Sequence, residues 1–130
     1  DPIRQADFFI SQVKLEKGDL APVLDIERKP RGKAQLQADL VKFLNRLEQH
    51  YGVKPIIYTS YKYMTRYLDT PEFAQYPLWI AHYYVDTLSY EGAWQFWQHT
   101  DYGTVPGIDE SVDLNVFNGS FDGLQRYTLK

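Results

Sequence analysis

The chain has 130 residues, a net charge of −3 and no cysteine. Its length allows one domain with a single hydrophobic core, and the lack of cysteine excludes disulfides, thiol nucleophiles and thiolate metal sites. The charge gives no reason to expect a nucleic-acid partner, and no apolar run approaches the ~20 residues of a membrane span.

The first half of the chain shows helical patterns separated by short apolar runs. Apolar residues at helical spacing predict a helix that begins at Pro2 and ends near Gly18. A second stripe predicts a helix over residues 33–51, with Gly52 as its left-handed cap. Ser60 can cap a third, short helix. This order is typical of parallel α/β units.

Five apolar runs are predicted as strands: residues 21–27, 55–59, 78–84, 94–100 and 112–117. The connections 85–93 and 101–111 are too short or too rich in Gly, Pro and Asp for packed crossover helices, so the second half should be helix-poor and contain antiparallel neighbours.

The fold class that follows is α/β, an irregular TIM-like β/α barrel with a helix-poor second half. Five strands fall short of the eight of a closed barrel. Residues 1–130 are therefore expected to form a single partial barrel, truncated at its N-terminus, with unpaired edges that invite association.

Two acids, Asp25 and Glu27, stand at the end of the first predicted strand. Side chains alternate along a strand, so both acids point to the same side. Two carboxylates in different environments could act as a general acid and an ionised partner, which is what breaking a glycosidic bond requires. Alternatively, Asp25 caps the following turn and Glu27 is solvated.

Further polar and aromatic residues share faces of the later strands. Asp113 and Asn115 lie on one side of the last strand, which is also ordinary strand alternation. Trp79 and Tyr83 flank a small alanine, and Trp97 lies in the next strand. Such rings can form a platform for sugars, with core packing as the alternative. The three histidines lack the spacing of paired metal ligands, so neither a metal nor another cofactor is expected.

Five segments in this order resemble the lysozymes of glycoside hydrolase family 25, the muramidases that cut bacterial peptidoglycan. The matching segments read PVLDIE (22–27), IYTS (57–60), LWIAHY (78–83), FWQHTD (96–101) and VPGIDESVDLNVF (105–117). No single segment is decisive, but five in this order with compatible spacing make a strong signal.

The resemblance implies roles for individual residues. Glu27 would be the general acid that protonates the departing sugar oxygen, and Asp25 and Asp113 would stabilise the positive charge on the ring. The residues expected to bind the glycan are Tyr58, Trp79, Tyr83, Trp97, Gln98 and Asn115. Family members begin with a strand that carries a further active-site aspartate, which residues 1–20 do not match.

The leading hypothesis is hydrolysis of the β-1,4 bond between N-acetylmuramic acid and N-acetylglucosamine, with peptidoglycan strands as the partner and a secreted or cell-envelope location. The second hypothesis is a truncated barrel that holds peptidoglycan without cleaving it. A third is a metal-dependent hydrolase that uses Asp25, His82 and His99. Chelator sensitivity would identify the third.

Overall fold

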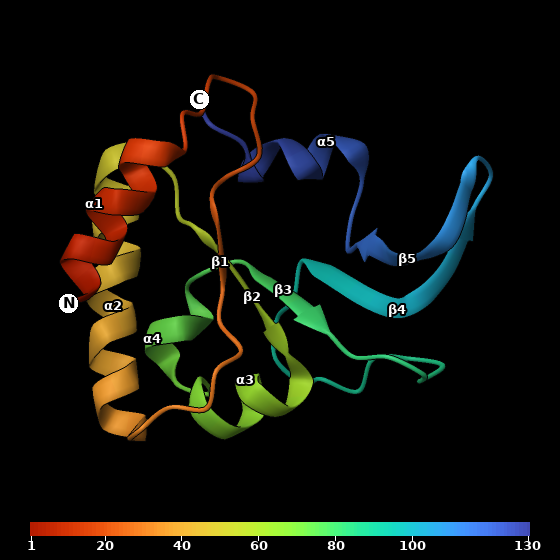
Figure 1. Cartoon of the computed structure of the whole chain (residues 1–130), viewed down its shortest axis with the longest axis horizontal. Coiled ribbons are helices and arrows are strands. Elements are labelled where there is room, and N and C mark those ends of the chain that lie inside the picture. The colour runs from red at the N-terminus through yellow and green to blue at the C-terminus, as the bar shows by residue number, and fades with distance from the viewer.

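The computed structural model describes residues 1–130 as a mixed α/β fold (Figure 1). Its elements are α1 (Pro2–Gln12), β1 (Val23–Asp25), α2 (Lys33–Tyr51), β2 (Ile56–Ser60), α3 (Tyr61–Tyr67), α4 (Pro71–Ala74), β3 (Leu78–Ala81), β4 (Phe96–Val105), β5 (Ile108–Phe117), α5 (Phe121–Leu124) and the 3-10 helix η1 (Gln125–Tyr127). The alternation of helices and strands in the first half is confirmed. The short helices α4 and α5 were not predicted.

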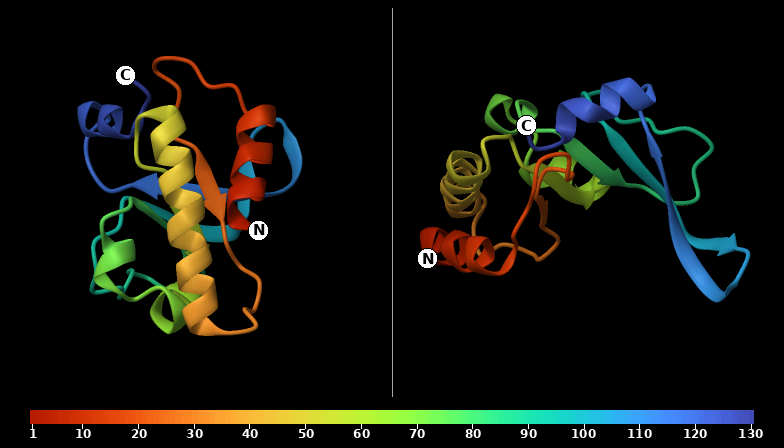
Figure 2. Two further views of the ribbon diagram at one scale, coloured as in Figure 1. Left: turned by 90° about the vertical axis from the view of Figure 1, so that its left-hand side faces the viewer. Right: turned by 90° about the horizontal axis from the view of Figure 1, so that it is seen from above.

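The five strands form one sheet in the order β1-β2-β3-β4-β5. Strands β1 to β4 are parallel neighbours, and β4 and β5 are antiparallel. The sheet is open, with β1 and β5 at its edges, and it curls like half of a barrel (Figure 2). The predicted number of strands and the antiparallel pairing in the second half are confirmed.

Residues 101–111, predicted to be a connection, instead form the outer half of a long β-hairpin. Strand β4 continues to Val105 and β5 starts at Ile108, with Gly107 at a φ of 93° in the turn. The hairpin projects from the rest of the molecule (Figure 2), and most of its outer residues are exposed. It therefore lacks the buried apolar face by which a strand is recognised in a sequence.

Helix α1 ends at Gln12, well before the predicted end near Gly18, because the backbone of Val13 is already extended. The following segment pairs with the C-terminus instead. The amide of Ala21 donates to the carbonyl of Tyr127 at 2.7 Å, and the amide of Leu129 donates to the carbonyl of Asp19 at 2.9 Å. The chain thus returns from β5 to the start of β1.

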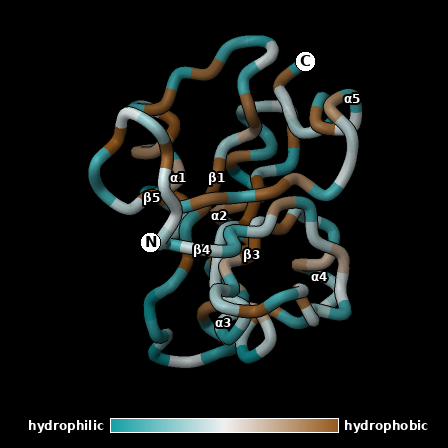
Figure 3. Tube along the Cα trace, turned by 90° about the vertical axis from the view of Figure 1, so that its right-hand side faces the viewer, coloured by the Kyte–Doolittle hydropathy of each residue, from teal (hydrophilic) through white to brown (hydrophobic).

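The main core lies between one face of the sheet and helices α2, α3 and α4. Its buried members are Leu40, Leu44, Ile57, Tyr63, Met64, Leu68, Phe73, Tyr76, Leu78 and Ile80. Hydrophobic stretches of the trace lie on β1 and β3 at the centre (Figure 3). Gly52 ends α2 at a φ of 76°, which confirms the predicted left-handed cap. On the opposite face of the sheet, Tyr127 packs edge-on against Phe96 and Phe117.

Candidate active site

One row of side chains crosses the sheet on the face opposite the main core. In the strand register Asp25 is paired with Tyr58, Tyr58 with Trp79, and Trp79 with Phe96. Paired residues of neighbouring strands point to the same face of a sheet. We call this side of the sheet, with Asp25, Tyr58 and Trp79, the inner face.

The acid pair Asp25 and Glu27 lies at the carboxyl end of β1, and both side chains are exposed. A hydrogen bond with Asp25 raises the pKa of Glu27 above its ordinary value, and burial and the negative charge of Asp25 raise it further. A carboxyl group that holds its proton to higher pH is suited to donate that proton.

The acids lie close enough to two tyrosines, Tyr58 and Tyr83, to affect their pKa values. Burial raises the pKa of Tyr58, with further contributions from Tyr83, Glu27 and Asp25. Burial also raises the pKa of Tyr83, and the charges of Asp113 and Glu27 add to it. The charge of Glu27 therefore acts on both hydroxyls, whereas Asp25 acts on Tyr58 and Asp113 on Tyr83. Both phenols remain protonated donors at neutral pH.

Gln98 joins this group from β4, with a side chain that is only 5% exposed. Its Oε1 accepts hydrogen bonds from the hydroxyls of Tyr58 and Tyr83, and its Nε2 donates to Oδ2 of Asp113 at 3.3 Å. A single buried amide thereby connects strands β2, β4 and β5 with Tyr83, in the segment after β3. The sequence placed Gln98 among the glycan-binding residues but did not indicate this connecting position.

Trp79 and Asn115 also meet on the inner face. The indole Nε1 of Trp79 donates to Oδ1 of Asn115 at 2.8 Å. The ring of Tyr58 packs edge-on against Trp79, with centroids 5.3 Å apart. The structure therefore brings together Asp25, Glu27, Tyr58, Trp79, Tyr83, Gln98, Asp113 and Asn115 at one side of the sheet.

Trp97 is not part of this group. It is paired with Ile80 in the register and packs against the main core, and its Nε1 donates to the carbonyl of His82 at 2.8 Å. Trp97 and Gln98 are neighbours in β4, so their side chains must point to opposite faces. Trp97 lies on the helix-covered side of the sheet.

Three hydrogen bonds fix the backbone on both sides of Glu27. The amide of Ile26 donates to the carbonyl of Tyr58 at 3.0 Å. The hydroxyl of Thr59 donates to the carbonyl of Ile26 at 2.5 Å, and the hydroxyl of Tyr63 donates to the carbonyl of Arg28 at 2.9 Å. Neither Thr59 nor Tyr63 was predicted to have a role at the site. Thr59 could have been identified as a polar residue on the buried side of a predicted strand, because a buried hydroxyl needs a hydrogen-bond partner.

We expect Thr59→Val to lower the free energy of unfolding by about 1–2 kcal/mol, because the change keeps the shape of a fully buried side chain but leaves the Ile26 carbonyl unpaired. Chemical denaturation would measure the difference. Thr65→Val is the matched control, since the Thr65 hydroxyl is exposed and bonds only to its own helix. Equal stability of the two variants would show that the Thr59 bond does not fix this segment.

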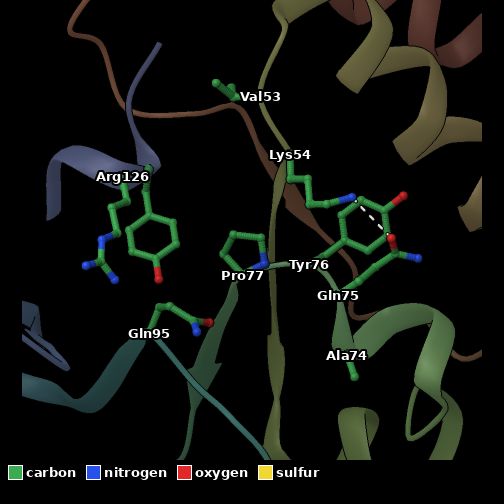
Figure 4. Close-up of a pocket in the computed structure, with 9 residues that line it drawn as sticks. Val53, Lys54, Ala74, Gln75, Tyr76, Pro77, Gln95 and Arg126 are labelled. Atoms are coloured by element: carbon green, nitrogen blue, oxygen red, sulfur yellow. Dashed lines mark hydrogen bonds between the residues drawn. The ribbon is translucent and has the colours of Figure 1, made fainter. Parts of the chain in front are cut away.

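Two cavities flank the sheet at opposite ends. One, of about 530 Å³, is lined by Glu27 and by residues of α3. The other, of about 320 Å³, lies where β2, β3 and β4 begin, with Lys54, Pro77, Gln95 and Arg126 on its wall (Figure 4). This second cavity contains none of the acids and lies at the amino ends of the strands, whereas α/β barrels place chemistry at the carboxyl ends.

The described chain contains no group of three His, Cys, Asp or Glu side chains close enough to hold a metal ion. None of its helices has the length and apolar character needed to cross a membrane.

Comparisons with known proteins identify the family of this chain. The model of a family described as glycosyl hydrolases family 25 matches residues 1–108. The protein YegX of Escherichia coli (strain K12) is 40% identical over 125 residues, which cover 95% of this chain and 46% of that protein. Lysozyme M1 of Streptomyces globisporus is 30% identical over 131 residues, covering 89% of this chain and 45% of that protein.

Solved structures show the same fold. A family 25 glycosyl hydrolase from Bacillus anthracis superposes with a TM-score of 0.86 at 30% identity, covering 99% of this chain and 64% of that one. A bacterial lysozyme from Streptomyces coelicolor gives a TM-score of 0.85 at 30% identity, covering 98% and 66%. The chain spans about half the length of the curated relatives it matches.

Proposed function

Because this chain belongs to glycosyl hydrolase family 25, we propose that it acts as a muramidase, which hydrolyses the β-1,4 bond between N-acetylmuramic acid and N-acetylglucosamine in peptidoglycan. The observation that carries the proposal is the acid pair at the end of β1, in which Asp25 raises the pKa of Glu27 beside a face rich in aromatic rings. The printed names of its relatives, lysozyme among them, support the same reaction.

In the proposed mechanism Glu27 protonates the oxygen of the departing sugar. The carboxylates of Asp25 and Asp113 stabilise the positive charge that develops on the ring. Trp79, Tyr83 and Asn115 bind the glycan on the inner face, together with Tyr58 and Gln98. Trp97 supports the inner face from the other side of the sheet, where its ring packs against the main core.

The reaction is tested by incubating the chain with purified peptidoglycan and analysing the released fragments by mass spectrometry. Fragments with N-acetylmuramic acid at their reducing end support the proposal. Intact glycan strands, or fragments ending in reducing N-acetylglucosamine, would contradict it.

We expect Asp25→Asn to shift the alkaline limb of the pH–activity profile to lower pH. The hydrogen bond and negative charge of Asp25 raise the pKa of Glu27, so removing that charge lowers it. A general acid works only while protonated, and activity therefore falls at a lower pH than in the unaltered chain. The profile of kcat/KM against pH measures the shift, with Asp122→Asn as a control far from Glu27 in sequence. If the alkaline limb stayed at the same pH or moved to higher pH, Asp25 would not be the group that raises the pKa of Glu27.

A second candidate function is glycan binding without cleavage, and it is favoured by the exposure of the acids. Asp25, Glu27 and Asp113 are all exposed on an open inner face, whereas glycosidases work in sites that exclude water. We infer that the curled sheet is part of the wall of a TIM-like barrel, because the matched structures are longer than this chain. Binding of glycan fragments, followed by tryptophan fluorescence, without release of products would support this second function.

Peptidoglycan as substrate implies a secreted or cell-envelope location. We also propose that the free edge of β1 pairs with further barrel segments or with another chain, since an unpaired edge offers free backbone donors and acceptors. If sedimentation gave the mass of a monomer at every concentration, the proposal that β1 pairs with a second copy would be contradicted.

A further inference from the structure

The cavity beside Glu27 has an unusual charge. It is about 530 Å³ in volume and opens between the loop after β1 and helix α3. Three cationic side chains, Lys29, Lys62 and Arg66, line it, and Glu27 is the single acid on its wall. The chain as a whole carries a net charge of −3. This cavity is therefore a cationic site on an acidic protein, directly against the proposed general acid.

The three cations are free of internal acidic partners. The two ion pairs in the structure are Arg46 with Asp7 and Lys54 with Glu48, and neither pair includes a residue of this cavity. The high pKa of Glu27 has Asp25 and burial as its causes, so the cations do not hold Glu27 ionised. Their charge remains available to a ligand.

The two sides of the cavity are fastened together. The hydroxyl of Tyr63, a buried residue of α3, donates to the carbonyl of Arg28 and holds the loop that carries Lys29 against the helix. The guanidinium of Arg66 lies 5.5 Å from the centroid of the Tyr67 ring, a contact that restricts a flexible side chain. Cations from the loop after β1 and from α3 thus line one space, whose two sides are joined by the Tyr63 hydrogen bond.

We propose that this cavity binds a carboxylate of the muramic acid residue next to the bond that is cut. The assignment rests on the proposed muramidase function. Muramic acid differs from N-acetylglucosamine by a lactyl group, which bears either a free carboxylate or a peptide stem with carboxylates of its own. Arginine and lysine are the side chains that pair with such groups. The cavity would distinguish peptidoglycan from an uncharged glycan of the same backbone.

The test compares three ligands with the complete chain, using tryptophan fluorescence to measure Kd. They are a glycan fragment with its peptide stems, the same fragment after an amidase has removed the stems, and a chitin oligosaccharide without carboxylates. We expect the carboxylate-bearing fragments to bind on the order of tenfold more tightly than the chitin oligosaccharide, and the preference to weaken with salt. If the stem-bearing fragment binds more tightly than the stripped one, the peptide stem supplies the carboxylate. If the stripped fragment binds more tightly, the lactyl group supplies it.

The double variant Lys62→Gln and Arg66→Gln should lose most of this preference and retain the affinity for the chitin oligosaccharide. The control is Arg4→Gln with Lys42→Gln, which removes the same charge from exposed positions on α1 and α2. Both doubles should unfold at the same temperature as the unaltered chain. Glycan binding with no preference for carboxylates, or equal losses in the two doubles, would overturn this assignment alone. Failure of the unaltered chain to bind any glycan would overturn the proposed function as well.

Discussion

Replacing Glu27 by glutamine should lower kcat for peptidoglycan hydrolysis by about 10²–10⁴-fold, the contribution typical of a positioned general acid. The amide keeps the size of the side chain and its place after β1, but it has no proton to give to the leaving oxygen. The affinity for glycan fragments should change little, because Tyr58, Trp79 and Gln98 do not depend on Glu27 for their hydrogen bonds. Release of reducing ends measures the rate, and fluorescence titration measures the affinity.

Stability separates this effect from damage to the fold. The folded protein holds the proton of Glu27 more tightly than the unfolded chain does, since its pKa is raised. The associated stability is present at low pH and is lost as the pH rises through the pKa of the folded state. Glu27→Gln should therefore be at least as stable as the unaltered chain at neutral pH. Glu16→Gln, at an exposed position outside the site, should leave activity unchanged. Full activity of Glu27→Gln would exclude the assigned role.

The parallel part of the fold could be predicted because its signals are local. The stripe of leucines in α2 and the position of Gly52 depend only on residues near one another in the chain, and both are confirmed. Ser60 caps α3 through a hydrogen bond from the amide of Tyr63, as its position before a helical pattern indicated. For α2 and α3 the element and its position were both correct, whereas α1 ends at Gln12, before the Gly18 that its pattern indicated.

The β4–β5 hairpin could not be predicted over its full length, because its outer half has no buried face. Tyr102, Val105 and Ile108 are exposed, and the turn depends on Gly107 at a positive φ. The sequence pattern of these residues is equally typical of a polar loop. Pairing across the hairpin also changes register three times, and such shifts depend on the partner strand and leave no trace in either strand alone.

The first strand was predicted over residues 21–27, but β1 covers only Val23–Asp25, so Glu27 lies in the loop and strand alternation does not place it. The contacts of Gln98 depend on residues from other parts of the sheet. Tyr58 lies 40 positions away from it in sequence. Only the register of β2, β3, β4 and β5 brings these groups to one point. The position of Trp97 could have been predicted from the sequence. Trp97 and Gln98 are adjacent in one strand, so their side chains cannot lie on the same face of the sheet.

Gln98→Leu should have the second-largest effect, lowering both stability and activity. Leucine is apolar and one carbon shorter than glutamine, and it offers neither acceptor nor donor, so the hydroxyls of Tyr58 and Tyr83 lose their partner and Asp113 loses its donor. Unpaired polar groups in a buried position cost about 1–3 kcal/mol of unfolding free energy. Denaturation with guanidinium measures this loss.

The activity of Gln98→Leu should fall by about tenfold or more, because the two tyrosines and Asp113 would no longer be held in one arrangement at the charge that develops on the sugar. Gln35→Leu is the matched control, since Gln35 is exposed and its amide bonds only to Asp39 on the same helix. Gln98→Glu adds a sharper comparison, because its carboxylate can still accept from both tyrosines but repels Asp113. If Gln98→Glu kept full activity, the bond to Asp113 would be unnecessary. If Gln98→Leu did so too, the buried amide would have no part in positioning the site.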